Sequence, residues 1–202
     1  MKPSAQQQLW MYETMCLIRH YEDSLAIAYF EGKLPPKIQK GLAFDLGAGP
    51  IPGEMHLAAG QESAAVGTCA HLEAKDSVWG THRAHHFAIA KGVDLDRMTA
   101  EIFGKVTGLG RGKGGHMHLF DTSVNFACTG IVGGGIPHAV GAGLAYKKLG
   151  TGAVAIAEFG DLFGAVDMMV AKGARQRQVG AAGGGHIEKA IRVADACEGE
   201  ET

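Results

Sequence analysis

The chain has 202 residues, of which 46% are hydrophobic and 20% are charged, so it is long enough to form a globular domain with a buried core. Its formal net charge of -2 gives no electrostatic reason to expect binding to nucleic acid or to a membrane surface. The sequence has no apolar run of the roughly 18 residues that span a membrane, no signal-peptide pattern and no closely spaced cysteines, so we expect a cytoplasmic protein with reduced, mostly buried thiols.

The first predicted element is a helix over residues 5–31, which Ser4 caps and Gly32 ends. Apolar residues at helical spacing predict that one face forms core or a subunit interface. These residues are Leu9, Tyr12, Met15, Cys16, Leu25 and Tyr29. A loop rich in proline and glycine follows over 33–54, and loops of this length are often functional. A helix of small residues is then expected over 60–73.

Short apolar segments alternate with helical ones in the rest of the chain. A strand is expected around 77–81, before a cluster of histidines, and Asp94 is expected to cap the next helix. The apolar face of that helix is predicted to contain Leu95, Met98, Ile102, Phe103 and Val106.

Two glycine-rich loops follow, over 108–115 and 130–135, and the second opens a helix with Pro137 in its first turn. The apolar run 153–159 reads as a strand that ends in Gly160-Asp161. This alternation predicts an α/β fold with a parallel sheet flanked by helices, although only two strands are recognisable.

The composition changes near residue 172. The segment 171–202 has no aromatic residue and contains three successive glycines at 183–185. A helix over 187–197 is the one element that it indicates, and no core element is expected in the rest.

The glycine-rich loop after the capped helix has two alternative interpretations. Gly110, Gly112 and Gly115 satisfy the pattern G-x-G-x-x-G of dinucleotide-binding sites. Such a fingerprint follows a strand and opens a helix, whereas here a helix precedes it and an irregular segment follows. The context disfavours a nicotinamide site but leaves an NAD-dependent oxidoreductase open as an alternative. No P-loop pattern is present, so the sequence does not support a kinase or ATPase.

Four motifs occur in a fixed order along the chain. They are Gly60-Gln61-Glu62; His82-Arg83-Ala84-His85; the loop from Gly110 to Met117-His118; and Gly130-Ile131-Val132-Gly133. Over residues 5–161 the chain resembles the α subunits of thiamine-diphosphate-dependent 2-oxo-acid and acetoin dehydrogenases, whose motifs are G-Q-E, Y-R-x-H, G-x-G-K-G-G-S-M-H and G-I-V-G. Two residues depart from those motifs, since His82 replaces the tyrosine and His116 replaces the serine.

The resemblance implies a thiamine-diphosphate-binding fold and a cofactor-binding role for four residues of these motifs. Arg83 corresponds to an arginine that pairs with the phosphates of the cofactor, a task that suits a guanidinium. His82 takes the place of a tyrosine that also touches the cofactor. Backbone groups of Gly130 and Val132 would hold the aminopyrimidine ring, where glycine permits a close approach of the backbone.

Catalytic and metal-binding residues follow from the same resemblance. His85 and His118 would line the channel through which the acyl group passes to lipoate, and either can transfer protons near neutral pH. Asp161 would bind Mg²⁺, which bridges the diphosphate oxygens, at the carboxyl end of a strand. Without the other motifs, Gly160-Asp161 reads simply as a turn.

The implied activity is the oxidative decarboxylation of a 2-oxo acid, or the cleavage of acetoin, with acyl transfer to lipoamide. The implied partners are a β subunit, in a heterotetramer, and the lipoyl-bearing acyltransferase of the complex. The segment 49–56 and the pair His85-His86 favour an acetoin-type relative.

The family pattern breaks directly after Asp161, where Leu162 stands in place of a glycine. No asparagine follows Asn125 to act as a second magnesium ligand. We therefore expect residues 1–161 to form a partial cofactor domain, incomplete at its C-terminal end, and residues 162–202 to form a divergent tail of a truncated or frameshifted chain that is impaired alone. A non-catalytic remnant that only pairs with a β subunit is a further alternative.

Zinc binding is another reading of the histidines. His82 and His86 are four residues apart, but the acidic residue of an H-E-x-x-H site is missing. His86 and His138 are therefore expected to have supporting roles.

Overall fold

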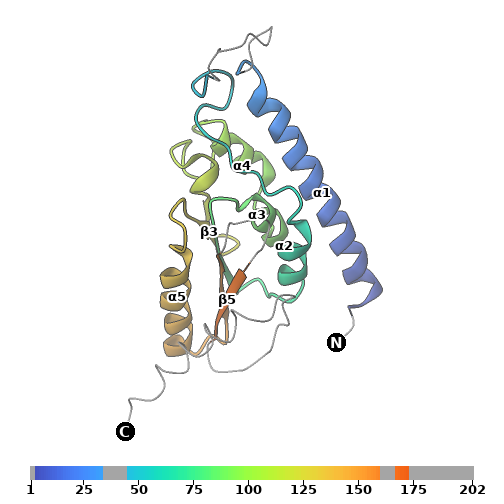
Figure 1. The fold of residues 1–202 in the computed structure, drawn as a ribbon. Helices are drawn as coiled ribbons and strands as arrows, with labels where there is room; N and C mark the ends of the chain where they lie inside the picture. Colours follow the sequence, from blue (N-terminus) through green and yellow to red (C-terminus); the bar gives the residue numbers. More distant parts are fainter. Residues whose placement is uncertain (1–2, 34–44, 160–166, 173–202) are drawn as a thin grey trace.

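A mixed sheet of five strands, in the order β2-β3-β1-β4-β5, forms the centre of the fold (Figure 1). The computed structural model describes residues 3–33, 45–159 and 167–172. The strands are β1 (Ser77–Gly80), β2 (Phe120–Asp121), β3 (Phe126–Cys128), β4 (Val154–Phe159) and β5 (Asp167–Lys172).

The three central strands are parallel. Val78 of β1 lies opposite Phe126 of β3 on one side and Ile156 of β4 on the other. The two edge strands are antiparallel to their neighbours, β2 to β3 and β5 to β4. The prediction of an α/β fold with a sheet flanked by helices is thus confirmed, but the sheet is parallel only in its centre, and it has three strands besides the two recognised in the sequence.

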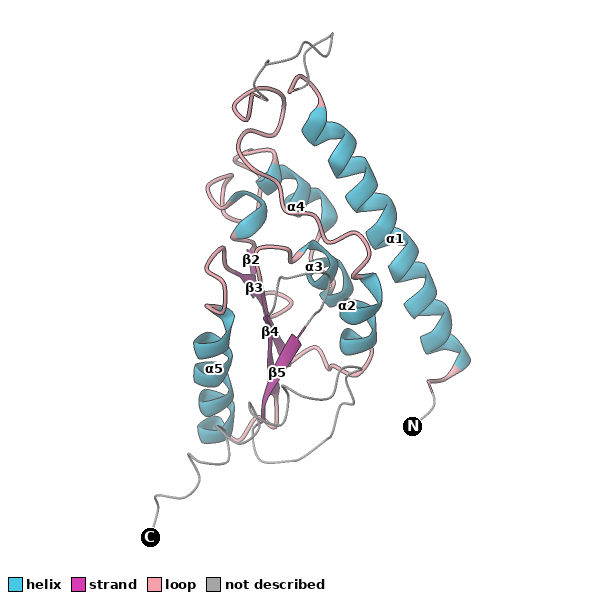
Figure 2. Cartoon of the chain, viewed as in Figure 1, coloured by secondary structure: helices cyan, strands magenta, loops and turns pink. Residues whose placement is uncertain are grey.

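Helices cover both faces of the sheet (Figure 2). Helix α5 lies against β1, β4 and β5, whereas α3 lies on the opposite face, with α2 and then α1 packed behind it. The helices are α1 (Ala5–Phe30), α2 (Glu62–Cys69), α3 (His85–Lys91), α4 (Leu95–Ile102), the 3₁₀ helix η1 (Gly115–Met117) and α5 (Gly135–Leu149).

The first helix begins as predicted, because the Ser4 side chain accepts a hydrogen bond from the backbone of Gln7 and the Gln7 side chain accepts one from the backbone N–H of Ser4. Its predicted apolar face is divided between the core and the surface of the described chain. Leu25 and Tyr29 are buried, but Leu9, Tyr12 and Cys16 are exposed. The residues that α1 buries are Thr14, Ile18, Glu22, Leu25 and Tyr29.

The other helices differ from the predictions in length and number. Helix α2 is shorter than the expected 60–73, and α3 was not predicted. Asp94 caps α4 by accepting a hydrogen bond from the backbone of Arg97. Met98 and Ile102 are buried as predicted, but Val106 lies beyond the end of α4 and is 74% exposed.

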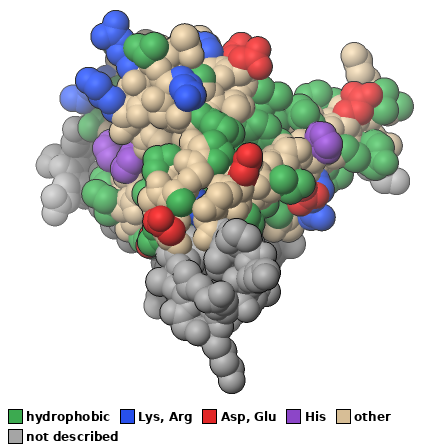
Figure 3. Space-filling model, turned by 90° about the horizontal axis from the view of Figure 1, so that it is seen from above, with side chains coloured by type: hydrophobic (Ala, Val, Ile, Leu, Met, Phe, Trp, Pro, Cys, Tyr) green, Lys and Arg blue, Asp and Glu red, His purple; other side chains and the backbone are tan. Residues whose placement is uncertain are grey.

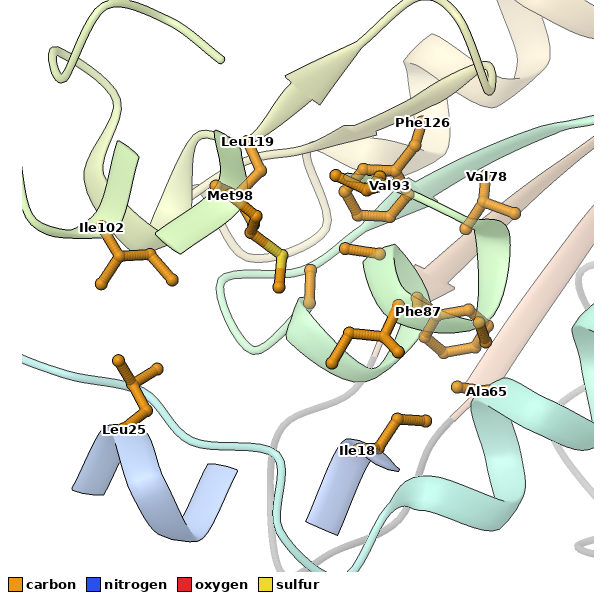
Figure 4. Close-up of a cluster of buried hydrophobic side chains, with 14 of the residues drawn as sticks. Ile18, Leu25, Ala65, Val78, Phe87, Val93, Met98, Ile102, Leu119 and Phe126 are labelled. Atoms are coloured by element: carbon orange, nitrogen blue, oxygen red, sulfur yellow. The ribbon is translucent and has the colours of Figure 1, made fainter. Parts of the chain in front are cut away.

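The main core fills the space between the sheet and the helices α1 to α4 (Figure 4). Ile18 and Leu25 of α1 point towards the same cluster as Phe87 of α3, Met98 of α4 and Phe126 of β3. A second, smaller cluster lies between α5 and the sheet. It consists of Ala139, Ala155 and Ala157, with Trp79, Ile136, Ala142 and Tyr146 against it.

Three cysteines lie in the described part of the chain, and all are free thiols. Cys69 is buried and Cys128 half-buried, whereas Cys16 is exposed. None of the described helices is both long and apolar enough to cross a bilayer. Cys197 and the helix predicted over 187–197 lie outside the described residues.

Candidate functional site

The candidate site lies where the three parallel strands end, because their carboxyl ends meet at one edge of the sheet. His82 and Arg83 follow β1, and Gly130 to Val132 follow β3. Hydrogen bonds hold the two loops at this edge: Thr129 N donates to Gly80 O at 3.3 Å, and Thr81 N donates to Glu158 Oε2 at 3.4 Å. Asp161 follows β4 but lies outside the described residues.

Arg83 brings the positive charge to this edge. Its side chain is half-buried, and Nη1 donates to Leu57 O at 2.9 Å. Its backbone N–H donates to Thr81 Oγ1 at 3.2 Å, which fixes the turn after β1. The segment around Leu57 therefore reaches over to the guanidinium, although it precedes β1 in the sequence.

The loop after β3 brings two predicted residues together. A Cβ atom at Gly130 would lie 3.2 Å from Nε2 of His118, so the absence of a side chain lets the histidine ring approach the backbone closely. Ile131 and Val132 are exposed on the same loop, at 72% and 67%. Gly133 has a φ of 77°, a conformation that favours glycine and turns the chain into α5.

His85 lies in the interior rather than on an open surface of the described chain. It is 0% exposed, and Nδ1 is 3.1 Å from Oε1 of Glu22, which α1 contributes and which is also 0% exposed. Nε2 of His85 has no hydrogen-bond partner among the described residues. His85 thus lies beneath the edge, and its predicted role in lining a channel is not visible in the described residues.

A cluster of histidines surrounds this interior position. The His85 and His116 ring centroids are 6.0 Å apart, and His116 stacks on His56 at 5.2 Å. His56 in turn meets the buried His82 edge to face at 4.7 Å. Sequence reasoning named His82, His85 and His116 but did not single out His56, and no pattern in the sequence indicated that His56 joins them.

Burial, and to a smaller extent the neighbouring His85, His56, His82 and His118, lower the pKa of His116 to about 3. His116 is therefore a neutral imidazole at physiological pH.

The glycine-rich loop 108–115 is organised around one carboxylate. Glu101 of α4 is 0% exposed, and its two oxygens accept hydrogen bonds from the backbone N–H groups of Gly110, Gly112 and Gly114 at 2.6, 2.8 and 2.6 Å. Burial alone would raise the pKa of Glu101, but these hydrogen bonds lower it below its usual value. The loop amides thus bind an internal anion, which contradicts their use as a cradle for the pyrophosphate of a dinucleotide.

The two histidines that were expected to have supporting roles contact residues next to the loops of the edge, namely Glu158 and Gly134. His86 is 0% exposed, with Nε2 3.6 Å from Oε1 of the buried Glu158, and burial lowers the pKa of His86 to about 3. Nδ1 of His138 is 2.6 Å from Gly134 O, and its ring stacks on Trp79 at 5.2 Å. Within residues 3–33 and 45–159, no group of three or more histidine, cysteine or acidic side chains is arranged to hold a metal ion, so the described residues do not support zinc.

The chain is similar in sequence to known dehydrogenase subunits. The family model of the dehydrogenase E1 component matches residues 37–166, a range that includes Asp161. The α subunit of acetoin:2,6-dichlorophenolindophenol oxidoreductase from Bacillus subtilis (strain 168) is 45% identical over 157 residues, which cover 77% of this chain and 42% of the relative. Its counterpart from Cupriavidus necator is 43% identical over 141 residues, or 69% of this chain and 42% of that protein.

A pyruvate dehydrogenase E1 component subunit α from Porphyra purpurea is 38% identical over 135 residues, which cover 66% of this chain and 34% of the relative. The chain thus spans less than half the length of these curated relatives. The matched range covers more than half of the chain, and it contains the loops that meet at the carboxyl edge of the sheet. The chain therefore belongs to the dehydrogenase E1 component family.

Proposed function

We propose that the chain forms part of the α subunit of a thiamine-diphosphate-dependent dehydrogenase that decarboxylates a 2-oxo acid or cleaves acetoin. One observation carries the proposal: the parallel strands β1 and β3 end side by side, so that Arg83, Gly130 and His118 belong to one edge of the sheet. The similarity to α subunits named for acetoin and for pyruvate supports this substrate class.

The residues present suit thiamine diphosphate. A diphosphate needs a cation, and the Arg83 guanidinium lies at the carboxyl edge. A flat heteroaromatic ring needs backbone groups that it can approach. Gly133 has open space beside it, and Ile131 and Val132 of the same loop are exposed. We include the thiamine-diphosphate-binding fold in the proposal. The loop 108–115 has no part in holding the diphosphate, because Glu101 already occupies its amides.

Magnesium is also part of the proposal, with Asp161 as its ligand. A carboxylate is a suitable ligand for Mg²⁺. In the sequence, Asp161 comes two residues after Phe159, the last residue of the parallel strand β4. The metal would neutralise the phosphate charge together with Arg83.

When bound, thiamine diphosphate supplies a nucleophilic ring carbon and an electron sink for the decarboxylation. The residues of this chain bind the cofactor and orient it. Arg83 holds the phosphate end, the backbone of Gly130 and Val132 orients the ring, and His82 borders the site. His118 lies at the edge, where it can hold or release a proton close to the substrate. The buried pair of His85 and Glu22 lies beneath this edge of the sheet and supports it.

The complete activity requires partners. We propose a β subunit, in a heterotetramer, and a lipoyl-bearing acyltransferase that accepts the acyl group. A chain that co-purifies with a β subunit but gives no turnover would instead be the non-catalytic remnant.

The test is calorimetric titration of the full chain with thiamine diphosphate and Mg²⁺, alone and after co-expression with the β subunit of an acetoin dehydrogenase. We expect saturable binding in the complex and weak binding by the chain alone. Arg83→Gln should weaken binding by the complex roughly tenfold or more, because a charge-assisted phosphate contact is lost. Arg97→Gln, which changes an exposed arginine on α4, is the matched control and should change nothing.

Turnover of acetoin, pyruvate and a branched-chain oxo acid by the complex, with an artificial electron acceptor, identifies the substrate. Binding of NADH without any response to thiamine diphosphate would contradict the proposal and favour the nicotinamide alternative. Micromolar binding of thiamine diphosphate by the chain alone would contradict the expectation that the isolated site is impaired.

A further inference from the structure

The contact between His56 and His116 determines where both rings carry their protons. Nε2 of His116 lies 3.1 Å from the backbone N of His56 and 2.9 Å from Nδ1 of the same residue. A backbone N–H can only donate, so Nε2 of His116 is an acceptor and carries no proton. In the neutral ring the proton of His116 is therefore on Nδ1.

The same acceptor also assigns the proton of His56. Two acceptor nitrogens at 2.9 Å would repel each other, so Nδ1 of His56 must be a donor. The proton of a neutral His56 then lies on Nδ1, and the lone pair of its ring lies on Nε2. Which nitrogen of a histidine is protonated is commonly fixed by the hydrogen bond that the other ring nitrogen makes.

His116 is suited to remain an acceptor over a wide range of pH. It is 6% exposed, and the groups around it are the histidines 56, 82, 85 and 118, with Glu22 of α1 paired to His85. Burial lowers the pKa of His116 to about 3, so protonation at Nε2, which would break both hydrogen bonds, does not occur near neutral pH.

His56 lies beside the candidate cofactor site. Its ring meets that of His82 at 4.7 Å, and the next residue, Leu57, accepts the hydrogen bond of Arg83 at 2.9 Å. The family motif has serine at the position of His116. A serine hydroxyl can both donate and accept, so it would not impose one tautomer on its neighbour.

We propose that His116 is a positioning residue that holds His56 in its Nδ1–H tautomer, so that Nε2 of His56 is the atom that accepts protons or hydrogen bonds at the site. The location of the site rests on the proposed function, whereas the tautomer of His56 does not depend on it.

The test uses the full chain labelled with ¹⁵N, whose imidazole nitrogens are observed by long-range proton–nitrogen correlation. The variant His56→Gln identifies the His56 signals by their loss. We expect a protonated Nδ1 and an unprotonated Nε2 for His56 at neutral pH, and no titration of His116 between pH 5 and 8. A protonated Nε2 on neutral His56, or a His116 that titrates near the usual pKa of about 6.5, would overturn the proposal.

Two variants of similar length separate positioning from packing. His116→Gln retains an oxygen acceptor near the position of Nε2, and should preserve the Nδ1–H signature. His116→Met fills similar space without a strong acceptor, and should shift neutral His56 towards the Nε2–H form. If the methionine variant is folded and leaves the His56 signature unchanged, the proposal is wrong; if it does not fold, the wild-type spectrum alone decides.

The readouts distinguish this proposal from the proposed function. The expected tautomer in a chain whose complex never binds thiamine diphosphate would support the positioning role and contradict the proposed function. Binding of thiamine diphosphate by a complex in which His56 has the opposite tautomer would support the proposed function and contradict the positioning role. If the positioning role and the proposed function are both correct, His116→Met should lower kcat of the complex more than His116→Gln does. The KM for thiamine diphosphate should change equally in the two variants.

Discussion

Glu101 shows how one side chain organises a loop that its glycines leave flexible. The carboxylate accepts three backbone hydrogen bonds, and the loop that it holds leads directly into His116 and His118. A Cβ atom at Gly108 would lie 2.5 Å from backbone atoms of Glu101, so the loop wraps closely around this residue. The glycines of the motif thus serve an internal anion, and the position of the two histidines depends on it.

Glu101→Gln should destabilise the chain by about 2–3 kcal/mol, because the amide NH₂ of glutamine faces N–H donors and leaves at least one of them unsatisfied. Urea unfolding at pH 7 measures the change. Glu13→Gln is the matched control, because Glu13 is exposed on α1, and it should stay within about 0.5 kcal/mol of wild type.

The sign of the pH dependence follows from the lowered pKa of Glu101. A carboxylate with a lowered native pKa contributes stability above its unfolded pKa of about 4.3, and this is lost as the pH falls through the native value. The difference between wild type and Glu101→Gln should therefore be complete at pH 7 and narrow only below about pH 4. If the difference in unfolding free energy between the two proteins is as large below pH 4 as at pH 7, the carboxylate charge is not its cause.

At the site, the sequence predicted individual residues better than their contacts. Arg83, Gly130 and His118 could be named because each belongs to a motif, and parallel strands bring such loops to one edge. The pairing of His56 with His116 spans 60 residues, and that of His85 with Glu22 spans 63. No local pattern encodes contacts of this range, so the burial of His85 could not be foreseen.

At the level of elements, local signals account for what was predicted. Capping residues gave the beginnings of α1 and α4, and an apolar run gave β4. Strands β2 and β3 are two and three residues long, too short for a recognisable pattern. Helix α3 is buried over residues 85–90, so it has no exposed face. Its sequence therefore lacks the alternation of apolar and polar residues by which amphipathic helices are recognised.

The packing of α5 on the sheet depends on small side chains. Ala139 of α5 and Ala155 and Ala157 of β4 are all fully buried in one cluster. A Cβ atom at Gly135 would lie 3.2 Å from the backbone oxygen of Trp79, so α5 approaches β1 closely at the end that carries the loop 130–133. The distance between helix and sheet therefore helps to set the position of the candidate cofactor loop.

Ala139→Leu should destabilise the chain by about 1–3 kcal/mol, because the larger side chain must push α5 away from the sheet. Thermal unfolding followed by circular dichroism measures this change. Ala145→Leu places the same side chain on the exposed side of α5 and should have little effect. Equal losses in the two variants would contradict a specific role for the small residues at this interface.

Considered as a whole, the described part of the chain leaves several large apolar side chains exposed. Leu9, Tyr12, Ile27 and Phe30 of α1 are exposed, on the side of the helix opposite to its buried residues. The space-filling view likewise shows hydrophobic side chains spread over an open face of the molecule (Figure 3). Exposed apolar side chains on one element commonly mark a contact with another protein, and the curated relatives are named as subunits of larger enzymes.

If α1 contacts the β subunit, a charge placed on its outer side should weaken assembly. Ile27 is 76% exposed in the described chain, so Ile27→Glu should leave the unfolding temperature unchanged. Burial of the new carboxylate at the interface would be unfavourable, and we expect roughly a tenfold loss of affinity for the β subunit in a binding assay with the immobilised full chain. Val106→Glu adds the same charge at a residue that is 74% exposed and lies outside α1. An equal loss in both variants would indicate a general effect of charge, and unchanged binding of Ile27→Glu would place the interface on another element.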